Sequence, residues 1–139
     1  MSRNDIVNQI SQAVKHIAPS ATVILYGSEA RGEAREDSDI DILILLDCDK
    51  RDGKQEDALT DKLYDIELSS GIVISPMIMP RKEWENRPFK TPFYINVMNE
   101  GVVIWKKNWT KRAVSRSVST WTKLSALDIV RRHNLTSLH

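Results

Sequence analysis

This sequence of 139 residues has a single cysteine. It has no long apolar run, and its N-terminus is polar. Cys48 is the single cysteine, so no disulfide can form within the chain. No run of 18 or more apolar residues occurs, which argues against a membrane-spanning helix. The polar N-terminal stretch MSRNDIVNQ has no apolar signal-peptide region. We therefore expect a cytoplasmic protein that does not contact a membrane.

The near-neutral net charge of +1 hides an uneven distribution along the chain. Residues 1–105 carry a net charge of −6, and residues 106–139 carry a net charge of +7. At this length we expect one folded domain over residues 1–107, followed by a basic tail over residues 108–139. The tail has only a weak apolar stripe, so we expect it either to be helical or to become ordered on a partner. Nucleic acid could bind such a tail but is not favoured, because a contact with an acidic protein surface or a tail that folds back on the acidic body would explain the charge equally well.

The apolar pattern predicts an α/β (α+β) fold, in which helices pack on a small mixed β-sheet. Strands are expected over residues 21–26, 39–46, 72–79 and 102–105. Helices are expected over residues 2–17, 56–69, 82–86 and 91–99, with one or two helical turns over residues 28–32. Pro76 lies within the third strand and predicts that this strand is bulged or at the edge of the sheet.

The Gly27–Ser28 pair follows the first predicted strand and precedes the short helical segment. Free backbone N–H groups at such a junction attract anions. Gly27 has no Cβ, so a phosphate could approach its backbone closely, and Ser28 adds a hydroxyl donor. Taken alone this is weak evidence, because many Gly-Ser pairs only form turns.

Two aspartates strengthen the case for a site. Asp39 and Asp41 alternate with isoleucines at the start of the second predicted strand, so their side chains point to the same face. Mg²⁺ binds oxygen ligands and commonly uses one or two carboxylates together with substrate phosphates. Either aspartate alone could be a solvated strand start. The whole pattern favours a site for a nucleoside triphosphate with Mg²⁺ or Mn²⁺, with two metal ions as in other phosphoryl-transfer sites.

The segment GSEARGEAREDSDID resembles the Gly-Ser-x10-Asp-x-Asp signature of the DNA-polymerase-β-like nucleotidyltransferase superfamily. It is most similar to the minimal nucleotidyltransferases that occur with a helical HEPN partner, some of which are antitoxins that adenylylate their toxin. The resemblance implies that Gly27 and Ser28 hold the triphosphate of ATP and that Asp39 and Asp41 bind the metals and serve catalysis. Arg31 and Ser38 are further nucleotide-binding candidates, although a surface ion pair would also explain Arg31.

One part of the family pattern is missing. Active members usually carry a third carboxylate on the strand that follows the helix, and here Ser75 stands about where that acid is expected. Asp65 and Glu67 are near in sequence but fall on the predicted helix or its end. Nucleotide binding is therefore a safer prediction than catalysis.

Three functions follow from these observations. The first is Mg²⁺-dependent transfer of a nucleotide, AMP from ATP, to an acceptor hydroxyl, for example on a HEPN toxin. The second is a catalytically weak or inactive subunit that binds nucleotide or a protein partner. The third, modification of an antibiotic, is less favoured because such enzymes usually have a second domain. The aromatic residues of the second half are expected to pack against the sheet, namely Trp84, Phe89, Phe93 and Tyr94.

Overall fold

The structure is a computed structural model that describes residues 2–48, 51–86 and 90–107. Its helices are α1 (Arg3–Ile17), α2 (Gly27–Arg31), α3 (Gly53–Ser70), α4 (Arg81–Glu85) and α5 (Pro92–Glu100). Its strands are β1 (Thr22–Tyr26), β2 (Ile40–Leu46), β3 (Ile74–Pro80) and β4 (Val102–Trp105). Phe89 and the basic tail over residues 108–139 lie outside the described residues.

The strands form one mixed sheet in the order β3-β2-β1-β4. β1 pairs antiparallel with both β2 and β4, whereas β2 and β3 run parallel. β3 is an edge strand, which confirms the edge position predicted from Pro76. The predicted α/β fold with a small mixed sheet is therefore confirmed.

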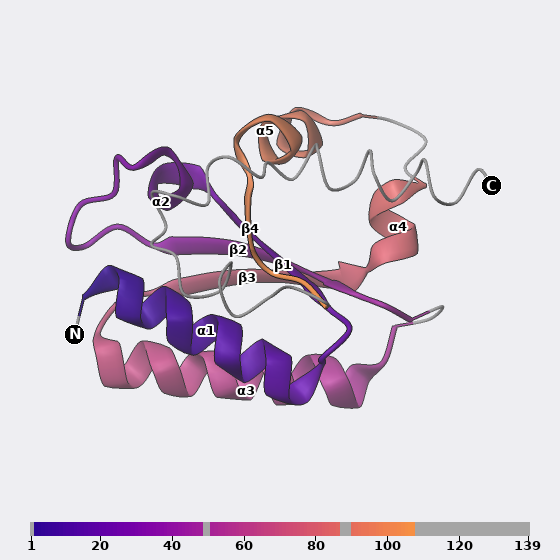
Figure 1. The fold of residues 1–139 in the computed structure, drawn as a ribbon, viewed down its shortest axis with the longest axis horizontal. Helices are drawn as coiled ribbons and strands as arrows, with labels where there is room; N and C mark the ends of the chain where they lie inside the picture. Colours follow the sequence, from indigo (N-terminus) through magenta and orange to yellow (C-terminus); the bar gives the residue numbers. More distant parts are fainter. Residues whose placement is uncertain (1, 49–50, 87–89, 108–139) are drawn as a thin grey trace.

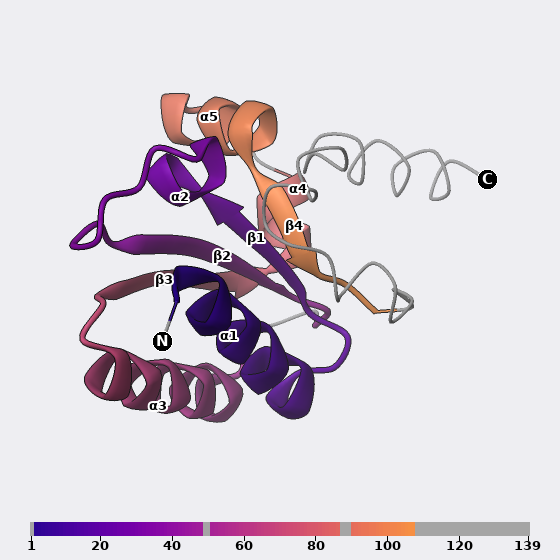
Figure 2. The ribbon, with the colours of Figure 1, turned by 60° about the vertical axis from the view of Figure 1, so that its left-hand side comes forward.

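Helices cover both faces of the sheet (Figure 1). α1 and α3 lie side by side across one face, where they bury the larger apolar core together with the isoleucines of β2. Figure 2 shows α5 and α4 on the other side of the sheet from this helix pair. There Trp84 and Val97 pack against Ile24 and Leu43 in a second, smaller core.

Local sequence signals set most of the helix ends. Ser2 and Asp5 form the reciprocal capping box of α1, and the Thr91 hydroxyl accepts a hydrogen bond from the Tyr94 backbone N–H at the start of α5. α3 begins three residues earlier than predicted, because the Asp52 carboxylate accepts from the backbone N–H groups of Lys54 and Gln55. This cap brings residues 53–55, which lie between the predicted strand and the predicted helix, into α3.

Two further boundaries differ slightly from prediction. β3 begins two residues later than expected, at Ile74; α3 ends at the left-handed Gly71, and the Ile72 backbone N–H then donates to the Ser70 hydroxyl oxygen at 3.2 Å. α4 begins at Arg81 instead of residue 82. Within the described residues, none of the helices is both long and apolar enough to cross a membrane.

Candidate functional site

The two halves of the Gly-Ser…Asp-x-Asp motif meet at one end of the sheet. β1 ends at Tyr26, and α2 begins at once with Gly27 and Ser28. β2 returns antiparallel to β1, with Tyr26 opposite Asp41 in the register. The pairing of these strands therefore places the Gly-Ser turn beside the aspartates, although ten residues of chain lie between Ser28 and Asp39.

Asp41 lies on the face of the sheet that α4 and α5 cover. Its neighbours Ile40 and Ile42 point to the other face and are fully buried beneath α1 and α3. Tyr26 and Ser75 are its register partners on the two adjacent strands, so the three side chains form a row on one face. The Tyr26 ring meets Phe93 of α5 edge to face, with 5.3 Å between ring centroids. Tyr26 and Phe93 thus pack together beside Asp41.

Two features of the geometry disfavour a side chain at Gly27. Its backbone is left-handed, with φ of +75°. A Cβ on Gly27 would lie 2.5 Å from Oδ2 of Asp41, so the carboxylate would have to move. The sequence suggested that Gly27 admits a phosphate. The structure shows that the space left by its missing side chain is occupied by the Asp41 carboxylate.

The electrostatics of the site favour a cation. Burial and, next, the charge of Asp39 raise the pKa of the Asp41 carboxyl, while Arg31 acts in the opposite direction. Burial and the charge of Asp41 likewise raise the pKa of the Tyr26 phenol. Two carboxylates close enough to repel each other are the hard oxygen donors that Mg²⁺ prefers. The donor set therefore fits a divalent cation that completes its coordination with phosphate and water.

In the part of the chain that the structure describes, no third carboxylate completes a metal site with this pair. Ser75 is opposite Asp41 in the parallel register of β2 and β3, which agrees with the position assigned to it from the sequence. Glu67 accepts a hydrogen bond of 2.9 Å from the backbone N–H of Ile74, and Asp65 is exposed on α3. Among the described residues, no group of three or more His, Cys, Asp or Glu side chains is arranged to hold a metal ion.

Arg31 and Ser38 lie between the two halves of the motif and already have protein partners. The Arg31 guanidinium donates to Glu33 and to Glu100 of α5, both at 3.0 Å, and all three side chains are exposed. The surface ion pair considered for Arg31 is therefore present. The Ser38 hydroxyl oxygen accepts from the Arg35 backbone N–H at 2.8 Å and closes the loop before β2.

Sequence reasoning missed Arg3. Its guanidinium reaches from the first turn of α1 to Glu29 of α2 and to backbone carbonyls in the loop that leads to Asp39. None of these partners is near Arg3 in the sequence, so no local motif indicates the contacts. An arginine at the first position of a helix was the available signal, because a positive charge is disfavoured there.

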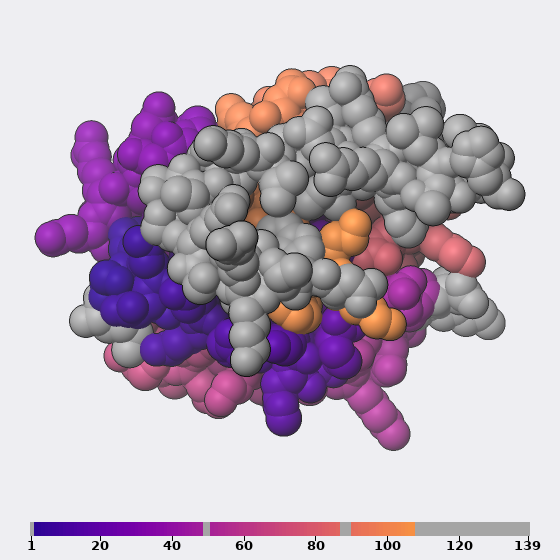
Figure 3. Space-filling model, in the orientation of Figure 1, coloured from indigo at the N-terminus to yellow at the C-terminus, as the bar shows by residue number. Residues whose placement is uncertain are grey.

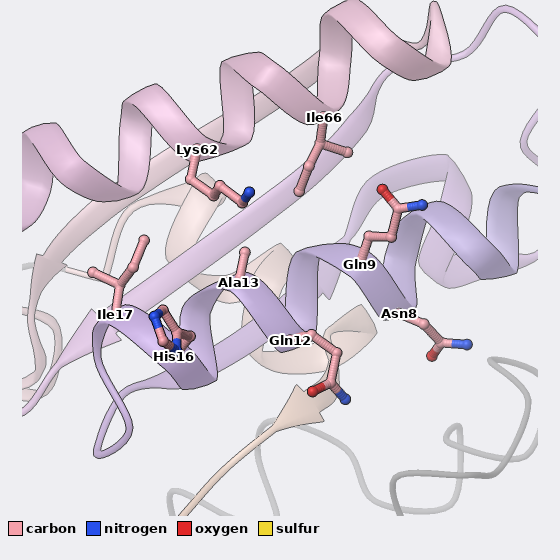
Figure 4. A pocket seen from close by; sticks show the side chains of 8 residues that line it. All are labelled: Asn8, Gln9, Gln12, Ala13, His16, Ile17, Lys62 and Ile66. Atoms are coloured by element: carbon pink, nitrogen blue, oxygen red, sulfur yellow. The ribbon is translucent and has the colours of Figure 1, made fainter.

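A groove of about 590 Å³ lies elsewhere on the molecule, between α1 and α3 (Figure 4). Its walls include Ala13, Ile17 and Ile66, with the polar side chains of His16 and Lys62 at the same groove. The sheet separates it from Asp41, since α1 and α3 cover the opposite face. The groove is therefore no part of the motif site.

The chain matches known proteins over most of its folded region. A family model described as a nucleotidyltransferase domain matches residues 7–104. Two proteins of Methanocaldococcus jannaschii, described by name as candidate protein adenylyltransferases, are 39% identical over 83 residues and 36% identical over 88 residues. These matches cover 60% and 59% of this chain and 76% of each relative.

A solved structure shares the fold at low sequence identity. The crystal structure of a toxin–antitoxin with AMP-PNP superposes with a TM-score of 0.52 and 19% identity, covering 94% of this chain and 98% of that one. At this identity the likeness concerns the fold alone. The family match contains the whole motif from Gly27 to Asp41, and the fold brings the two halves of the motif together. The resemblance read from the motif is thus confirmed, and the chain belongs to the nucleotidyltransferase domain family.

Proposed function

We propose that this chain transfers AMP from ATP to a hydroxyl group on a protein, with Mg²⁺ or Mn²⁺ bound at Asp39 and Asp41. The observation that carries the proposal is the pairing of Tyr26 with Asp41, which sets the Gly27–Ser28 turn beside two repelling carboxylates. In such a transfer the acceptor oxygen forms a bond to the α-phosphorus of ATP. The bond from that phosphorus to the bridging oxygen breaks, pyrophosphate leaves, and the acceptor proton passes to a base or to water.

The chain's own residues would bind and orient the reactants. Asp39 and Asp41 would hold the cation, which when bound would offset the charge of the phosphates. Ser28 would donate its hydroxyl to a phosphate oxygen. Arg31 is held only by exposed ion pairs, which are worth about 0–1 kcal/mol, so a triphosphate could compete for its guanidinium. Ser38, whose hydroxyl oxygen accepts from Arg35, would donate its hydroxyl hydrogen to the nucleotide.

The comparisons support the choice of reactants. The two archaeal relatives are named as candidate protein adenylyltransferases, which supports AMP transfer to a protein. The structural neighbour is a toxin–antitoxin with AMP-PNP, an ATP analogue, which supports ATP and a toxin partner. We propose a helical HEPN-type protein as that partner and acceptor. The basic tail over residues 108–139 lies beyond the family match and would form a separate partner-binding segment.

The absence of a carboxylate at Ser75 favours a second candidate, a subunit that binds nucleotide and partner but transfers slowly. A general base contributes typically about 10²–10⁴-fold to a rate, and the described residues supply none beside Asp41 other than Asp39. We expect the isolated chain to bind ATP and to transfer AMP slowly, unless the acceptor or partner supplies the missing group.

Calorimetry and labelling together test the proposal. We expect weak Mg²⁺ binding alone and clear binding of Mg²⁺ with ATP, because two carboxylates leave most coordination positions to phosphate and water. Asp39→Asn and Asp41→Asn should each abolish the heat of nucleotide binding, whereas Asp57→Asn on exposed α3 should leave it unchanged. Labelled ATP with the helical partner as acceptor then measures transfer. Brisk transfer that survives Asp39→Asn would contradict the proposal.

The variant Ser75→Asp distinguishes a chain that transfers AMP from a subunit that only binds nucleotide and partner. The substitution restores a carboxylate opposite Asp41 in the register. ATP affinity should stay within about threefold, and the transfer rate should rise by at least about tenfold if only the base is missing. Met77→Asp, on the same face one alternation further along β3, is the matched control and should not raise the rate. An unchanged rate in Ser75→Asp would favour the binding subunit.

A further inference from the structure

The guanidinium of Arg3 joins three segments of the chain that are distant in sequence. Nε donates to Oε2 of Glu29 in α2 at 2.6 Å, and Nη2 donates to the carbonyl oxygen of Ser38 at 2.7 Å. Nη1 donates to the carbonyl oxygen of Glu36 at 3.2 Å. Figure 3 shows the start of α1, in indigo, against the purple surface that includes α2 and the loop after it. Arg3 therefore connects α1, α2 and the loop that precedes Asp39.

Arg3 does not stabilise α1, the helix to which it belongs. It occupies the first position of α1, where the helix dipole disfavours a positive charge. The N-terminal end of α1 is already capped by the reciprocal hydrogen bonds of Ser2 and Asp5. Arg3 also lies outside residues 7–104, the part that matches the family model. Its contacts are thus best explained by the segments that it reaches.

The burial of the pair makes its geometry specific. The Glu29 side chain is 8% exposed and the Arg3 side chain 20% exposed. A charge-assisted bond in such surroundings is stronger and better directed than a surface ion pair. The remaining arms of the guanidinium are satisfied by the two carbonyl oxygens, an arrangement that the planar fork of arginine provides and the point charge of lysine does not.

These contacts fix the backbone on one side of Asp39, and the segment that leads into β3 fixes the other side. The Ser38 carbonyl held by Arg3 belongs to the peptide group that continues into Asp39. On the far side, the Ile40 backbone N–H donates to the Val73 carbonyl oxygen at 2.9 Å. Asp39 itself precedes β2 and has no place in the strand ladder. Without the Arg3 contacts, the chain from Ala34 to Asp39 would be held mainly by its own turn at Arg35 and Ser38.

We propose that Arg3 is a positioning residue, which holds the Asp39 carboxylate at a fixed place relative to Ser28 and so raises the affinity for a divalent cation with nucleotide. The inference rests on the proposed function, because it assigns cation binding to Asp39. Arg3 acts through the backbone: Glu29 fixes it to the helix that begins with the Gly-Ser turn, and Ser38 fixes it to the start of Asp39.

Arg3→Lys tests the role, since lysine keeps a positive charge beside Glu29 but cannot bind both carbonyl oxygens. Hydrogen exchange should rise by about tenfold or more at the amides of residues 35–40. The affinity for Mn²⁺ with AMP-PNP, followed by electron paramagnetic resonance of Mn²⁺, should fall by about three- to tenfold. Arg3→Leu combined with Glu29→Leu removes both charges and checks the result should Arg3→Lys fold poorly.

Arg51 offers a matched control. Its guanidinium also donates to two carboxylates and one carbonyl oxygen, those of Glu56, Glu83 and Ile78, away from the motif. Arg51→Lys should change neither the exchange of residues 35–40 nor the Mn²⁺ affinity.

Two results would overturn the inference alone, and a third would overturn both the inference and the proposed function. Unchanged exchange in both Arg3 variants would show that the loop does not depend on Arg3. Raised exchange with unchanged Mn²⁺ affinity would give Arg3 a structural role only. A wild-type chain that gives no Mn²⁺ signal with AMP-PNP would overturn the proposed function, and the inference with it.

Discussion

The two faces of β2 differ in what they carry, although they belong to one strand of seven residues. One face holds Ile40, Ile42 and Ile44, all fully buried beneath α1 and α3. The other begins with Asp41 and continues with Leu43 and Leu45, which pack under α4 and α5. The first face is apolar along its whole length. The second is divided, with a charged site at the start of the strand and a core at its end.

This division places the demands of stability and binding on different residues. The isoleucine face anchors the strand over its full length, so the opposite face can begin with Asp41 even though the nearby charge of Asp39 repels it. Substitutions on the first face should therefore affect folding, and substitutions at the start of the second should affect binding.

The largest expected effect is on the apolar face. Ile42→Ala removes a fully buried side chain and should lower the free energy of unfolding by about 2–5 kcal/mol, measured by chemical denaturation. Met77→Ala, on the exposed part of β3, should cost less than about 1 kcal/mol. Equal costs in the two variants would contradict the view that the isoleucine face anchors the strand.

At the site end, Ser28→Ala should affect binding without affecting folding. Loss of a hydrogen bond to a charged phosphate oxygen should cost about 1.5–3 kcal/mol of ATP affinity, measured by calorimetry with Mg²⁺. Ser69→Ala in α3 removes a hydroxyl that bonds only within its helix and should leave the affinity unchanged. If Ser28→Ala binds ATP as the wild type does, the phosphates lie elsewhere.

Gly27 and Gly32 form a matched pair that separates an effect on folding from an effect on cation binding. Both are left-handed, with φ of +75° and +72°, so alanine at either should cost about 1–2 kcal/mol of stability. Only at Gly27 does the added Cβ meet Asp41, and that flexible carboxylate can turn away. We expect Gly27→Ala alone to weaken Mn²⁺ binding in the presence of AMP-PNP. Equal Mn²⁺ affinities in the two variants would disprove the link between Gly27 and Asp41.

The smallest expected effect is a gain of stability. The pKa of Asp41 is raised in the folded chain, mainly by burial, so the fold favours the protonated carboxyl. Ionisation therefore costs stability as the pH rises through the folded pKa, and Asp41→Asn should stabilise the nucleotide-free chain at neutral pH. The gain should be under about 1 kcal/mol, since the half-buried carboxylate is partly screened by water.

Thermal unfolding at two pH values checks this last expectation. The stabilisation by Asp41→Asn should disappear below the ordinary aspartate pKa of 3.8, where Asp41 is protonated in both the folded and the unfolded chain. Asp37→Asn on the exposed loop is the control. A gain of equal size at acid and neutral pH would rule out ionisation as its cause.

Much of the fold could be predicted from local sequence signals. The capping box at Ser2 and the threonine cap before Pro92 give the helix starts correctly, and Pro76 gives the edge strand. The start of α3 was missed because Gly53 is a poor helix former, so the capping role of Asp52 was hidden in a polar segment.

The site was only partly predictable, because part of it depends on long-range contacts. The motif identifies Gly27 and Asp41, but their contact depends on the register of β1 against β2. The contacts of Arg3 with Glu29 and Ser38 span 26 and 35 residues, and no local pattern encodes them. Burial of Glu29 was likewise invisible, since a charged residue in a short polar helix is ordinarily exposed.

Pro76 also limits how other molecules can meet this protein. A free sheet edge exposes unpaired backbone groups that can recruit a strand from another chain, the usual start of edge-to-edge aggregation. β3 forms one edge of the sheet, and at Pro76 it has no N–H to offer to such a strand. Lengthening of the sheet past β3 is therefore disfavoured. A protein that approaches this side of the molecule, next to Ser75, has to recognise side chains instead of adding a strand.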